Sequence, residues 1–341
     1  MADRKLMFHI GSHKTGTTAI QTALYQDRER LAENGIHYPK TPKSLGKGTS
    51  KQHAIAHRVA ETGFKTQLRL WLFFSKLHRQ ARDYDLTLLS AEPVYRHIAP
   101  NRNLKPDDEW FAAHEAYLQR FAKFLRKFDL EIVLYVRRPH EFALSLFKEH
   151  VSKARSHPWP SFLELTERQS TYYDYPRRIE CLKRVFGSVD VRHYEAEAKK
   201  GLVPEFYRRL GVDSPKSSSN PVRVSISNRG VLWLHARSGE GELHEQRYRV
   251  LYAARDPDEL FAEDTRSTLW QSAEDLQTFV DRHASSYDMD FFERPAGLEH
   301  PPTIWTSDAQ AEADARYLVW RAENIEMLEN FDAKGGRHYH A

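Results

Sequence analysis

The chain has 341 residues, with 51 Lys and Arg against 47 Asp and Glu, which gives a formal net charge of +4 when histidine is neutral. Hydrophobic residues make up 40% and charged residues 29%, which excludes a disordered or fibrous protein. Because the charge is nearly balanced and positive side chains are interspersed with negative ones, we expect a small anionic ligand and no nucleic-acid partner.

The sequence contains no segment that would cross a membrane and no set of cysteines that could form a disulfide. The longest apolar run, residues 70–74, is far shorter than the roughly 18 residues of a membrane span. The apolar stretch after residues 1–5 is too short for a signal peptide. The single cysteine, Cys181, excludes an intramolecular disulfide and a zinc site built on several thiolates. We therefore expect a cytoplasmic protein without an integral membrane segment.

Short apolar runs alternate with helical patterns along the first part of the chain. In chain order, strands are predicted at residues 5–10, 86–90, 131–136 and 189–194. Helices are predicted at residues 17–34, 52–61, 66–84, 108–128, 139–153 and 173–186. This alternation predicts an α/β fold in which helices cover both faces of a central parallel sheet, giving three layers.

The character of the sequence changes after residues 214–221, a segment with two prolines, four serines and no apolar residue. From about Gly230 onward we find helical stretches without a good strand. The last of these helices should begin at Ser307, with Gln310 at the spacing of a capping box. We predict a core at residues 1–215 and a mainly helical extension at residues 216–341.

The segment after the first predicted strand, which runs from Gly11 to Thr18 (GSHKTGTT), has the spacing of a phosphate-binding loop. Nucleotide hydrolases carry a lysine where this chain has Thr17, and here the lysine has moved into the loop as Lys14. Successive backbone N–H groups and the start of the following helix can still hold an anion. The loop therefore predicts a binding site for a phosphate or a similar group.

The run from Lys14 to Thr18 (KTGTT) resembles the first loop of the sulfotransferases that use 3′-phosphoadenosine-5′-phosphosulfate (PAPS). The fold of that family is a P-loop-like α/β sheet with a relocated lysine. The resemblance implies that Lys14 contacts the bridging and sulfuryl oxygens of PAPS and takes part in catalysis. It further implies that the loop binds the 5′-phosphate end of PAPS through His13, Thr15, Gly16, Thr17 and Thr18.

A second motif of the same family consists of a strand that ends in Arg and a helix that carries Ser eight residues later. Here Arg137 follows a predicted strand, Pro139 suits a first helical position, and Ser145 lies eight residues after Arg137. A guanidinium offers a planar fork of donors to a phosphate. The resemblance, which covers about residues 5–230, implies that Arg137 and Ser145 bind the 3′-phosphate.

Two residues compete for the role of the catalytic base that activates the acceptor hydroxyl. Glu92 follows the strand at residues 86–90, at the edge where parallel sheets bind ligands, and several carbohydrate sulfotransferases have a catalytic Glu near this point. Pro93 predicts an extended backbone at Glu92, which would direct the carboxylate into the crevice. His53 is the alternative, since members of the family have a histidine near here. His57 lies four residues later on the same helix face.

These motifs predict a PAPS-dependent sulfotransferase that transfers a sulfuryl group to the hydroxyl of a small molecule, a carbohydrate or a glycolipid. The helical region after residue 215 would cap the acceptor cleft. We expect no metal, because His53 and His57 lack an evident third ligand and sulfuryl transfer has no obligatory Mg²⁺.

Two other classes of protein stay open at this point. A P-loop nucleotide kinase or NTPase would use the same loop, although this chain lacks the lysine at Thr17 and a clear acidic magnesium ligand after a strand. A noncatalytic nucleotide-binding relative would keep both motifs and lose the base.

Overall fold

The structure is a computed structural model, and it describes residues 4–12, 14–46, 52–98, 104–152, 157–215, 226–253, 267–289 and 292–333. The chain forms two compact units, each made of segments that lie far apart in the sequence. The first unit comprises Met1–Phe142, Arg168–Val222 and His283–Glu293, and the second comprises Ala143–Glu167, Arg223–Arg282 and Arg294–Ala341. The predicted border after residue 215 stays a prediction, because residues 216–225 lie outside the described ones.

A five-stranded parallel sheet forms the centre of the first unit. In the order β2-β3-β1-β4-β5, its strands are β1 (Lys5–Gly11), β2 (Ile36–His37), β3 (Leu86–Ser90), β4 (Asp129–Val136) and β5 (Val189–His193). The central strands β1 and β4 carry continuous runs of buried residues, as expected where both faces of a parallel sheet are covered. All four predicted strands are confirmed. The two residues of β2 are too few to show a periodicity in the sequence.

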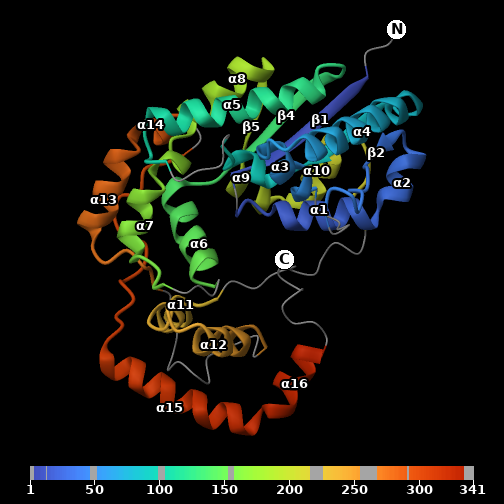
Figure 1. Cartoon of the computed structure of the whole chain (residues 1–341). Helices are drawn as coiled ribbons and strands as arrows, with labels where there is room; N and C mark the ends of the chain where they lie inside the picture. The colour runs from blue at the N-terminus through green and yellow to red at the C-terminus, as the bar shows by residue number, and fades with distance from the viewer. Residues whose placement is uncertain are drawn as a thin grey trace. The chain divides into compact units, whose positions relative to one another are not determined.

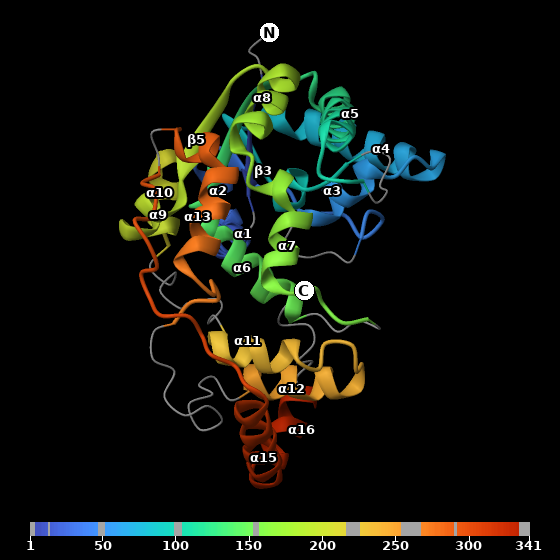
Figure 2. The ribbon, with the colours of Figure 1, turned by 90° about the vertical axis from the view of Figure 1, so that its left-hand side faces the viewer.

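Helices cover both faces of this sheet, as Figures 1 and 2 show. One face is covered by α1 (Thr17–Gln26), α2 (Arg28–Glu33), α9 (Tyr194–Lys199) and α10 (Leu202–Arg209). The other is covered by α3 (His53–Ala60), α4 (Phe64–Gln80), α5 (Asp108–Leu125) and α8 (Tyr175–Phe186). The predicted three-layer α/β arrangement is confirmed.

Alternating residues of the sheet support the two helical layers. On one face, Met7 and Tyr135 belong to the same buried cluster as Ile20 of α1 and Phe206 of α10. Phe8 points to the opposite face, where its ring lies 5.1 Å from the ring of Phe121 in α5. This alternation along β1 follows from the two-residue period of a strand.

The rest of the first unit consists of short elements, namely η1 (Ala81–Asp83), η2 (Glu92–Tyr95), η3 (Ser170–Tyr172) and α14 (Ala284–Tyr287). The helix α6 (Pro139–Val151) begins in the first unit, and its residues from Ala143 onward belong to the second.

The second unit is mainly helical in the residues that the structure describes. It contains most of α7 (Phe162–Arg168), together with α11 (Asn228–His235), α12 (Glu242–Ala253), α13 (Ala273–Arg282), α15 (Ser307–Glu323) and α16 (Ile325–Ala333). In its core, the buried guanidinium of Arg247 pairs with Asp314, which also accepts a hydrogen bond of 2.9 Å from the indole of Trp233.

One predicted helix is divided in the structure, and another begins at the predicted residue but has a different cap. The helix predicted at residues 17–34 is interrupted at Asp27, whose carboxylate accepts hydrogen bonds from Arg30 in the first turn of α2. In α15 the capping residue is Thr306 instead of Ser307, since the Thr306 hydroxyl accepts from the N–H of Ala309. In both places a polar side chain accepts a hydrogen bond from a nearby donor. The spacing of apolar residues in the sequence does not reveal such a hydrogen bond.

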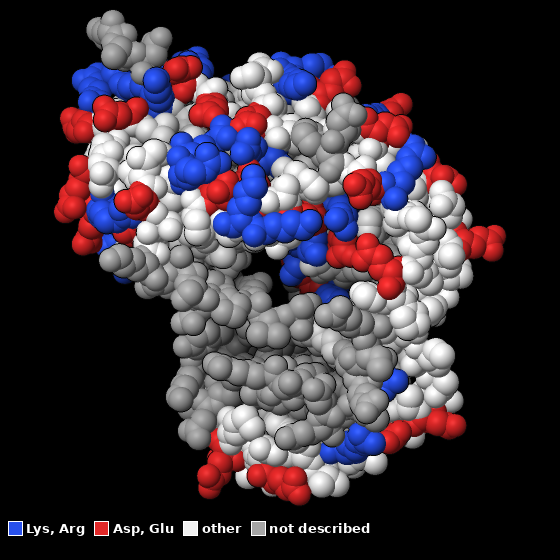
Figure 3. Space-filling model, turned by 180° about the vertical axis from the view of Figure 1, so that it is seen from behind, with Lys and Arg blue, Asp and Glu red and all other residues white. Residues whose placement is uncertain are grey.

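Charges of both signs are intermixed on the face that Figure 3 presents, in agreement with the interspersed pattern of the sequence. In the part of the chain that the structure describes, no helix combines the length and the apolar character needed to cross a membrane.

Candidate functional site

The carboxyl ends of β3, β1 and β4 lie side by side at one edge of the sheet. His9 pairs with Ser90 of β3, and Gly11 pairs with Tyr135 of β4, both in parallel register. After β1 the chain continues to β2 and β3 on one side, whereas after β4 it continues to β5 on the other. Ligands of open parallel sheets bind where the connections diverge in this way. That point lies between the loop after β1 and the segment after β4.

The loop between β1 and α1 has the backbone geometry of an anion site. Lys14 has a φ of +57° and Gly16 a φ of +67°, while Thr15 between them lies outside the left-handed region. Such an alternation turns successive N–H groups toward one side and forms a concave surface for an anion. Helix α1 begins at Thr17 without a side chain that caps its first N–H groups and without an acidic residue in its first turn. These donors therefore suit a negatively charged ligand.

Both glycines of the loop lie in close contact with neighbouring side chains. A Cβ on Gly16 would lie 2.2 Å from a methyl carbon of Leu202 in α10. A Cβ on Gly11 would lie 2.5 Å from the Thr17 hydroxyl and 2.6 Å from the Thr15 hydroxyl. The side chains of Thr15 and Thr17 are thus buried against Gly11. Any contact of these two residues with a phosphate would come from their backbone N–H groups.

The other predicted loop residues have different environments. Lys14 and Thr18 are half-buried, and His13 lies outside the described residues. The predicted roles of Lys14, Thr18 and His13 stay predictions.

Arg137 brings the second motif to the loop. Its guanidinium Nη1 donates to the carbonyl oxygen of Lys14 at 3.3 Å, although the two residues are 123 positions apart in the sequence. The hydroxyl of Tyr175 in α8 donates to the carbonyl of Arg137 at 2.5 Å and holds the backbone at the end of β4. The two motifs that the sequence predicts to share a ligand are therefore adjacent.

Two carboxylates also surround Arg137. Its Nη2 donates to Glu141 at 3.1 Å, and its Nε lies 3.5 Å from Glu195. The Nε makes no hydrogen bond to a described residue, so one donor of the fork is unsatisfied. A phosphate that binds Arg137 would have to compete with these two carboxylates for the guanidinium.

Sequence reasoning did not include these carboxylates in the site. Glu141 follows Arg137 by four residues, a spacing that places two residues on the same side of a helix and could have been noticed. Glu195 follows β5, and its position near Arg137 results from the pairing of Val136 with His193. The Nε2 of His193 lies 2.9 Å from the Glu195 carboxylate. Burial lowers the pKa of His193, and the attraction of Glu195 opposes this effect without cancelling it.

Ser145, the second predicted ligand of the 3′-phosphate, lies half-buried on α6. It belongs to the second unit, whereas Arg137 belongs to the first. The role predicted for Ser145 therefore stays a prediction.

The two candidate bases lie next to each other. The Nε2 of His53, at the start of α3, is 3.8 Å from a carboxylate oxygen of Glu92, at the start of η2. Their side chains are 26% and 12% exposed, and the Nε2 atom of His53 is itself buried. The sequence presents these residues as alternatives, and the structure combines them in one place.

The backbone at Glu92 differs from the prediction. Pro93 predicts extended chain at Glu92, but Glu92 opens the 3₁₀ helix η2, and the preceding Ala91 has a φ of −141° and a ψ of 89°. A proline is tolerated in the first turn of a helix because its missing N–H would have no partner there. The carboxylate is thus directed by the start of a helical turn.

Ser90, the last residue of β3, holds this pair in position. Its N–H donates to the side-chain oxygen of Gln52 at 2.8 Å, and its carbonyl accepts from the amide of Gln21 at 3.0 Å. Gln52 directly precedes His53, and Ser90 lies two residues before Glu92. The buried residues Gln52 and Ser90 therefore fix where α3 and η2 begin.

His9 completes the buried network. Its Nδ1 lies 2.8 Å from the Ser90 hydroxyl, and burial lowers its pKa to about 3 in spite of the Glu92 carboxylate nearby, so it is neutral at pH 7. Sequence reasoning did not find His9, Gln21 or the bridging role of Gln52, because their contacts join β1, α1, α3 and β3. A single sequence contains no signal for such contacts.

His57, the other histidine of α3, faces a different partner. Its Nδ1 lies 2.8 Å from the Nε2 of His97, and burial is the largest of the effects that lower its pKa. Over the described ranges, no group of three or more His, Cys, Asp or Glu side chains is arranged to hold a metal ion.

Comparison with known proteins gives little similarity. No family model and no curated protein matches the chain. A solved structure, the sulfotransferase domain from the curacin biosynthetic pathway, is similar over 91% of this chain and 96% of that domain, with 10% sequence identity and a TM-score of 0.32. A similarity of that size carries no argument about activity, so function has to be argued from the residues of the site.

Proposed function

We propose that the protein is a cytoplasmic, PAPS-dependent sulfotransferase that transfers a sulfuryl group to the hydroxyl of a carbohydrate or glycolipid acceptor. The observation that carries this proposal is the contact between Arg137 and the carbonyl of Lys14. It joins a loop suited to one phosphate of a nucleotide with a guanidinium suited to a second phosphate. A nucleotide with phosphates on both its 5′ and 3′ sides, such as PAPS, matches these two positions.

PAPS would supply a sulfuryl group activated by its bond to the 5′-phosphate. The acceptor oxygen forms a bond to sulfur while the bond between sulfur and the bridging oxygen breaks, and adenosine 3′,5′-bisphosphate leaves. In this scheme the Lys14 ammonium stabilises the negative charge that develops on the bridging oxygen. The N–H groups of the loop and of α1 hold the 5′-phosphate, and Arg137 binds the 3′-phosphate.

The proton of the acceptor hydroxyl passes to Glu92 or His53 in the same step. With 3.8 Å between them, one member of the pair can accept the proton while the other stabilises the resulting charge. A carboxylate beside an imidazolium is favourable, and so is a protonated carboxyl beside a neutral imidazole. The geometry therefore suits general-base catalysis by the pair of His53 and Glu92. Mutation of each residue in turn measures its own contribution to turnover.

The experiment that tests the proposal compares nucleotides by thermal unfolding of the full chain. Adenosine 3′,5′-bisphosphate without Mg²⁺ should raise the melting temperature, and binding at about 100 times the dissociation constant adds roughly 2.7 kcal/mol to the free energy of unfolding. ATP at the same concentration should do much less. A larger shift with ATP and Mg²⁺ would show that a kinase or NTPase is the better assignment.

A turnover assay with PAPS and a panel of hydroxyl acceptors then separates an enzyme from a noncatalytic relative. Lys14→Met should lower turnover and weaken retention of PAPS, because the ammonium lies at the transferred group in this proposal. A protein that binds adenosine 3′,5′-bisphosphate but sulfates no acceptor of the panel would favour the noncatalytic alternative.

A further inference from the structure

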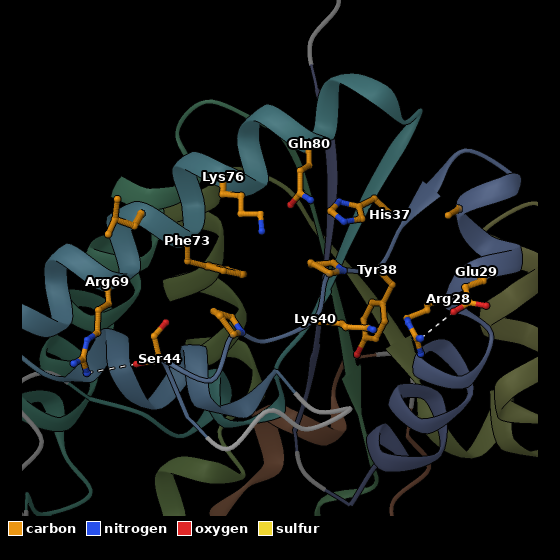
Figure 4. A pocket seen from close by; sticks show the side chains of 14 residues that line it. Arg28, Glu29, His37, Tyr38, Lys40, Ser44, Arg69, Phe73, Lys76 and Gln80 are labelled. Atoms are coloured by element: carbon orange, nitrogen blue, oxygen red, sulfur yellow. Dashed lines mark hydrogen bonds and ion pairs between the residues drawn. The ribbon is translucent and has the colours of Figure 1, made fainter.

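A pocket of about 610 Å³ lies in the first unit, between α2, α4 and the segment that follows β2 (Figure 4). Its volume falls in the range of small-molecule sites, about 300–1,000 Å³. None of the predicted PAPS or catalytic residues lines it. The pocket is therefore separate from the site described above.

Positive charge dominates the lining of this pocket. Its cations are Arg28, Lys40, Arg69 and Lys76, and Glu29 is its single carboxylate. Four positive charges against one negative charge leave a surplus of +3 within one pocket, compared with +4 for the whole chain. A pocket of this composition favours an anionic ligand.

The two lysines are the cations best suited to receive an anion. Arg28 pairs with Glu29 at 3.0 Å, and Arg69 donates to the Ser44 carbonyl at 3.5 Å. By contrast, Lys40 and Lys76 have no hydrogen-bond or ion-pair partner within the described part of the chain. In Figure 4, Lys76 extends from α4 toward the segment that carries Tyr38.

The remaining walls of the pocket are largely apolar. Phe73 extends from α4 into its middle in Figure 4, and Tyr38, Leu72 and two prolines add further apolar surface. His37 adds no charge at neutral pH, because burial lowers its pKa. The pocket thus combines a cationic set with an apolar body, which suits a ligand that has both an anionic group and a hydrocarbon part.

An exposed apolar stripe on α4 adjoins the pocket. Phe64, Leu68, Trp71 and Leu72 are 80%, 47%, 58% and 53% exposed, and their spacing places them along one side of the helix. The opposite side of α4 is already buried in the core through Leu70, Phe73, Phe74 and Leu77. Leu72 belongs to both the stripe and the pocket lining, so the two apolar surfaces are continuous. One apolar side of α4 is buried in the core, and the other, the stripe, is exposed to solvent. Exposed apolar surfaces of this kind mark sites of interaction.

Charge complementarity decides which partner fits. The exposed cations Lys65, Arg69, Lys76 and Arg79 lie along the same helix, which has no acidic residue. Exposed Trp, Phe and Leu side chains together with Lys and Arg are the pattern of a helix that lies in a membrane interface. The exposed apolar residues of α15, Leu318 and Val319, differ in this respect, because that helix carries both acidic and basic residues.

We propose that the pocket and the stripe on α4 bind an anionic lipid in a membrane surface. The acidic head group lies between Lys40 and Lys76, and the hydrocarbon chains contact Leu72 and the rest of the stripe. This site is independent of the proposed sulfotransferase activity. It would bring the protein to a lipid surface through α4.

Flotation of the full chain with lipid vesicles tests the proposal. The protein should bind vesicles that contain phosphatidylglycerol, should not bind phosphatidylcholine alone, and should dissociate as the salt concentration rises. Each lysine near an anionic surface contributes about a fivefold effect, so Lys40→Gln with Lys76→Gln should weaken binding roughly 30-fold. Trp71→Ser with Leu72→Ser should weaken binding as well. Equal binding by the lysine variant and the wild type would overturn the proposal.

Matched controls keep these results interpretable. Leu318→Ser with Val319→Ser removes the same kind of exposed apolar residue from α15 and should leave vesicle binding unchanged; a loss of binding here would contradict the role given to α4. At constant ionic strength, inorganic phosphate should fail to displace the protein from vesicles, and full displacement under that condition would mean that a free anion is the ligand. All substituted residues are exposed, so thermal unfolding and the response to adenosine 3′,5′-bisphosphate should match the wild type.

Discussion

The loop after β1 and the pair of His53 and Glu92 lie at the same edge of one sheet, but they are held in place differently. The loop owes its shape to consecutive residues, with positive φ angles at Lys14 and Gly16. The pair is assembled from α3 and η2 through the buried contacts of Ser90 with residues of three other elements. The shape of the loop is thus largely local, whereas the contact of Arg137 with the loop and the geometry of the proposed base depend on tertiary packing.

This difference leads to separable effects of mutation. Changes in the loop or at Arg137 should alter nucleotide binding first, and changes at the pair should alter turnover first. Changes in the buried network around Ser90 should lower stability and turnover together. The following predictions test this separation, from the largest expected effect to the smallest.

Glu92→Gln should have the largest effect, because it keeps the size of the side chain and removes its basicity. We expect turnover to fall by about 10² to 10⁴ while the affinity for adenosine 3′,5′-bisphosphate hardly changes. Steady-state kinetics and nucleotide titration measure the two quantities. His53→Asn is the matching variant. The residue whose substitution lowers turnover more is the base, and the other residue supports it. Wild-type turnover in both variants would show that the acceptor does not bind at this edge.

Arg137→Ala should weaken the binding of adenosine 3′,5′-bisphosphate by about 1.5 to 3 kcal/mol, the usual contribution of a charged hydrogen bond. Adenosine 5′-phosphate, which lacks the 3′-phosphate, should bind almost as it does to the wild type. Calorimetric titration of both ligands gives the comparison, and equal losses would reject the assignment. Glu141→Gln is an informative control, because removing a carboxylate 3.1 Å from Arg137 should strengthen binding of the bisphosphate.

Gln52→Leu tests whether the buried network positions the pair. The variant leaves the N–H of Ser90 and the carbonyl of Pro39 without their partner, so we expect the free energy of unfolding to fall by about 1 to 3 kcal/mol. Turnover of the folded variant should also fall, with nucleotide affinity preserved. Gln277→Leu, at an exposed position of α13, should change neither quantity. Unchanged kcat in Gln52→Leu would argue against a positioning role.

The pH dependence of stability should reveal the buried histidines. His9 has a pKa of about 3 in the folded protein against 6.5 as the ordinary value, so between these pH values the unfolded chain binds a proton that the folded chain does not. Stability should therefore fall as the pH is lowered, by about 1.6 kcal/mol from this residue between pH 6.5 and pH 5. His114 acts in the same direction, since burial also lowers its pKa.

Denaturant unfolding at several pH values measures this effect. His9→Gln should reduce the slope of stability against pH, because glutamine can bond to Ser90 without binding a proton. His157→Gln, at an exposed position, is the matched control for the loss of a histidine. A slope that His9→Gln does not change would mean that His9 is not the buried neutral group described here.

The sequence by itself determined the features that depend on neighbours along the chain. The apolar runs predict four of the five strands, and the glycines of the loop predict its position between β1 and α1. The sequence did not predict the interruption at Asp27 or the capping role of Thr306, because both depend on side-chain hydrogen bonds that the apolar periodicity does not reveal.

Only the tertiary structure decided which distant residues meet. In the folded protein Arg137 contacts the carbonyl of Lys14, and Glu195 lies beside the Arg137 guanidinium. His53 and Glu92, which the sequence presents as alternatives, lie 3.8 Å apart. The tertiary structure also created the cationic pocket beside α4, whose lining comes from three separate elements. The physical reason is that periodicity shows which face of a strand or helix is buried but not which other element covers it. Contacts between residues many positions apart are set by strand order and helix packing.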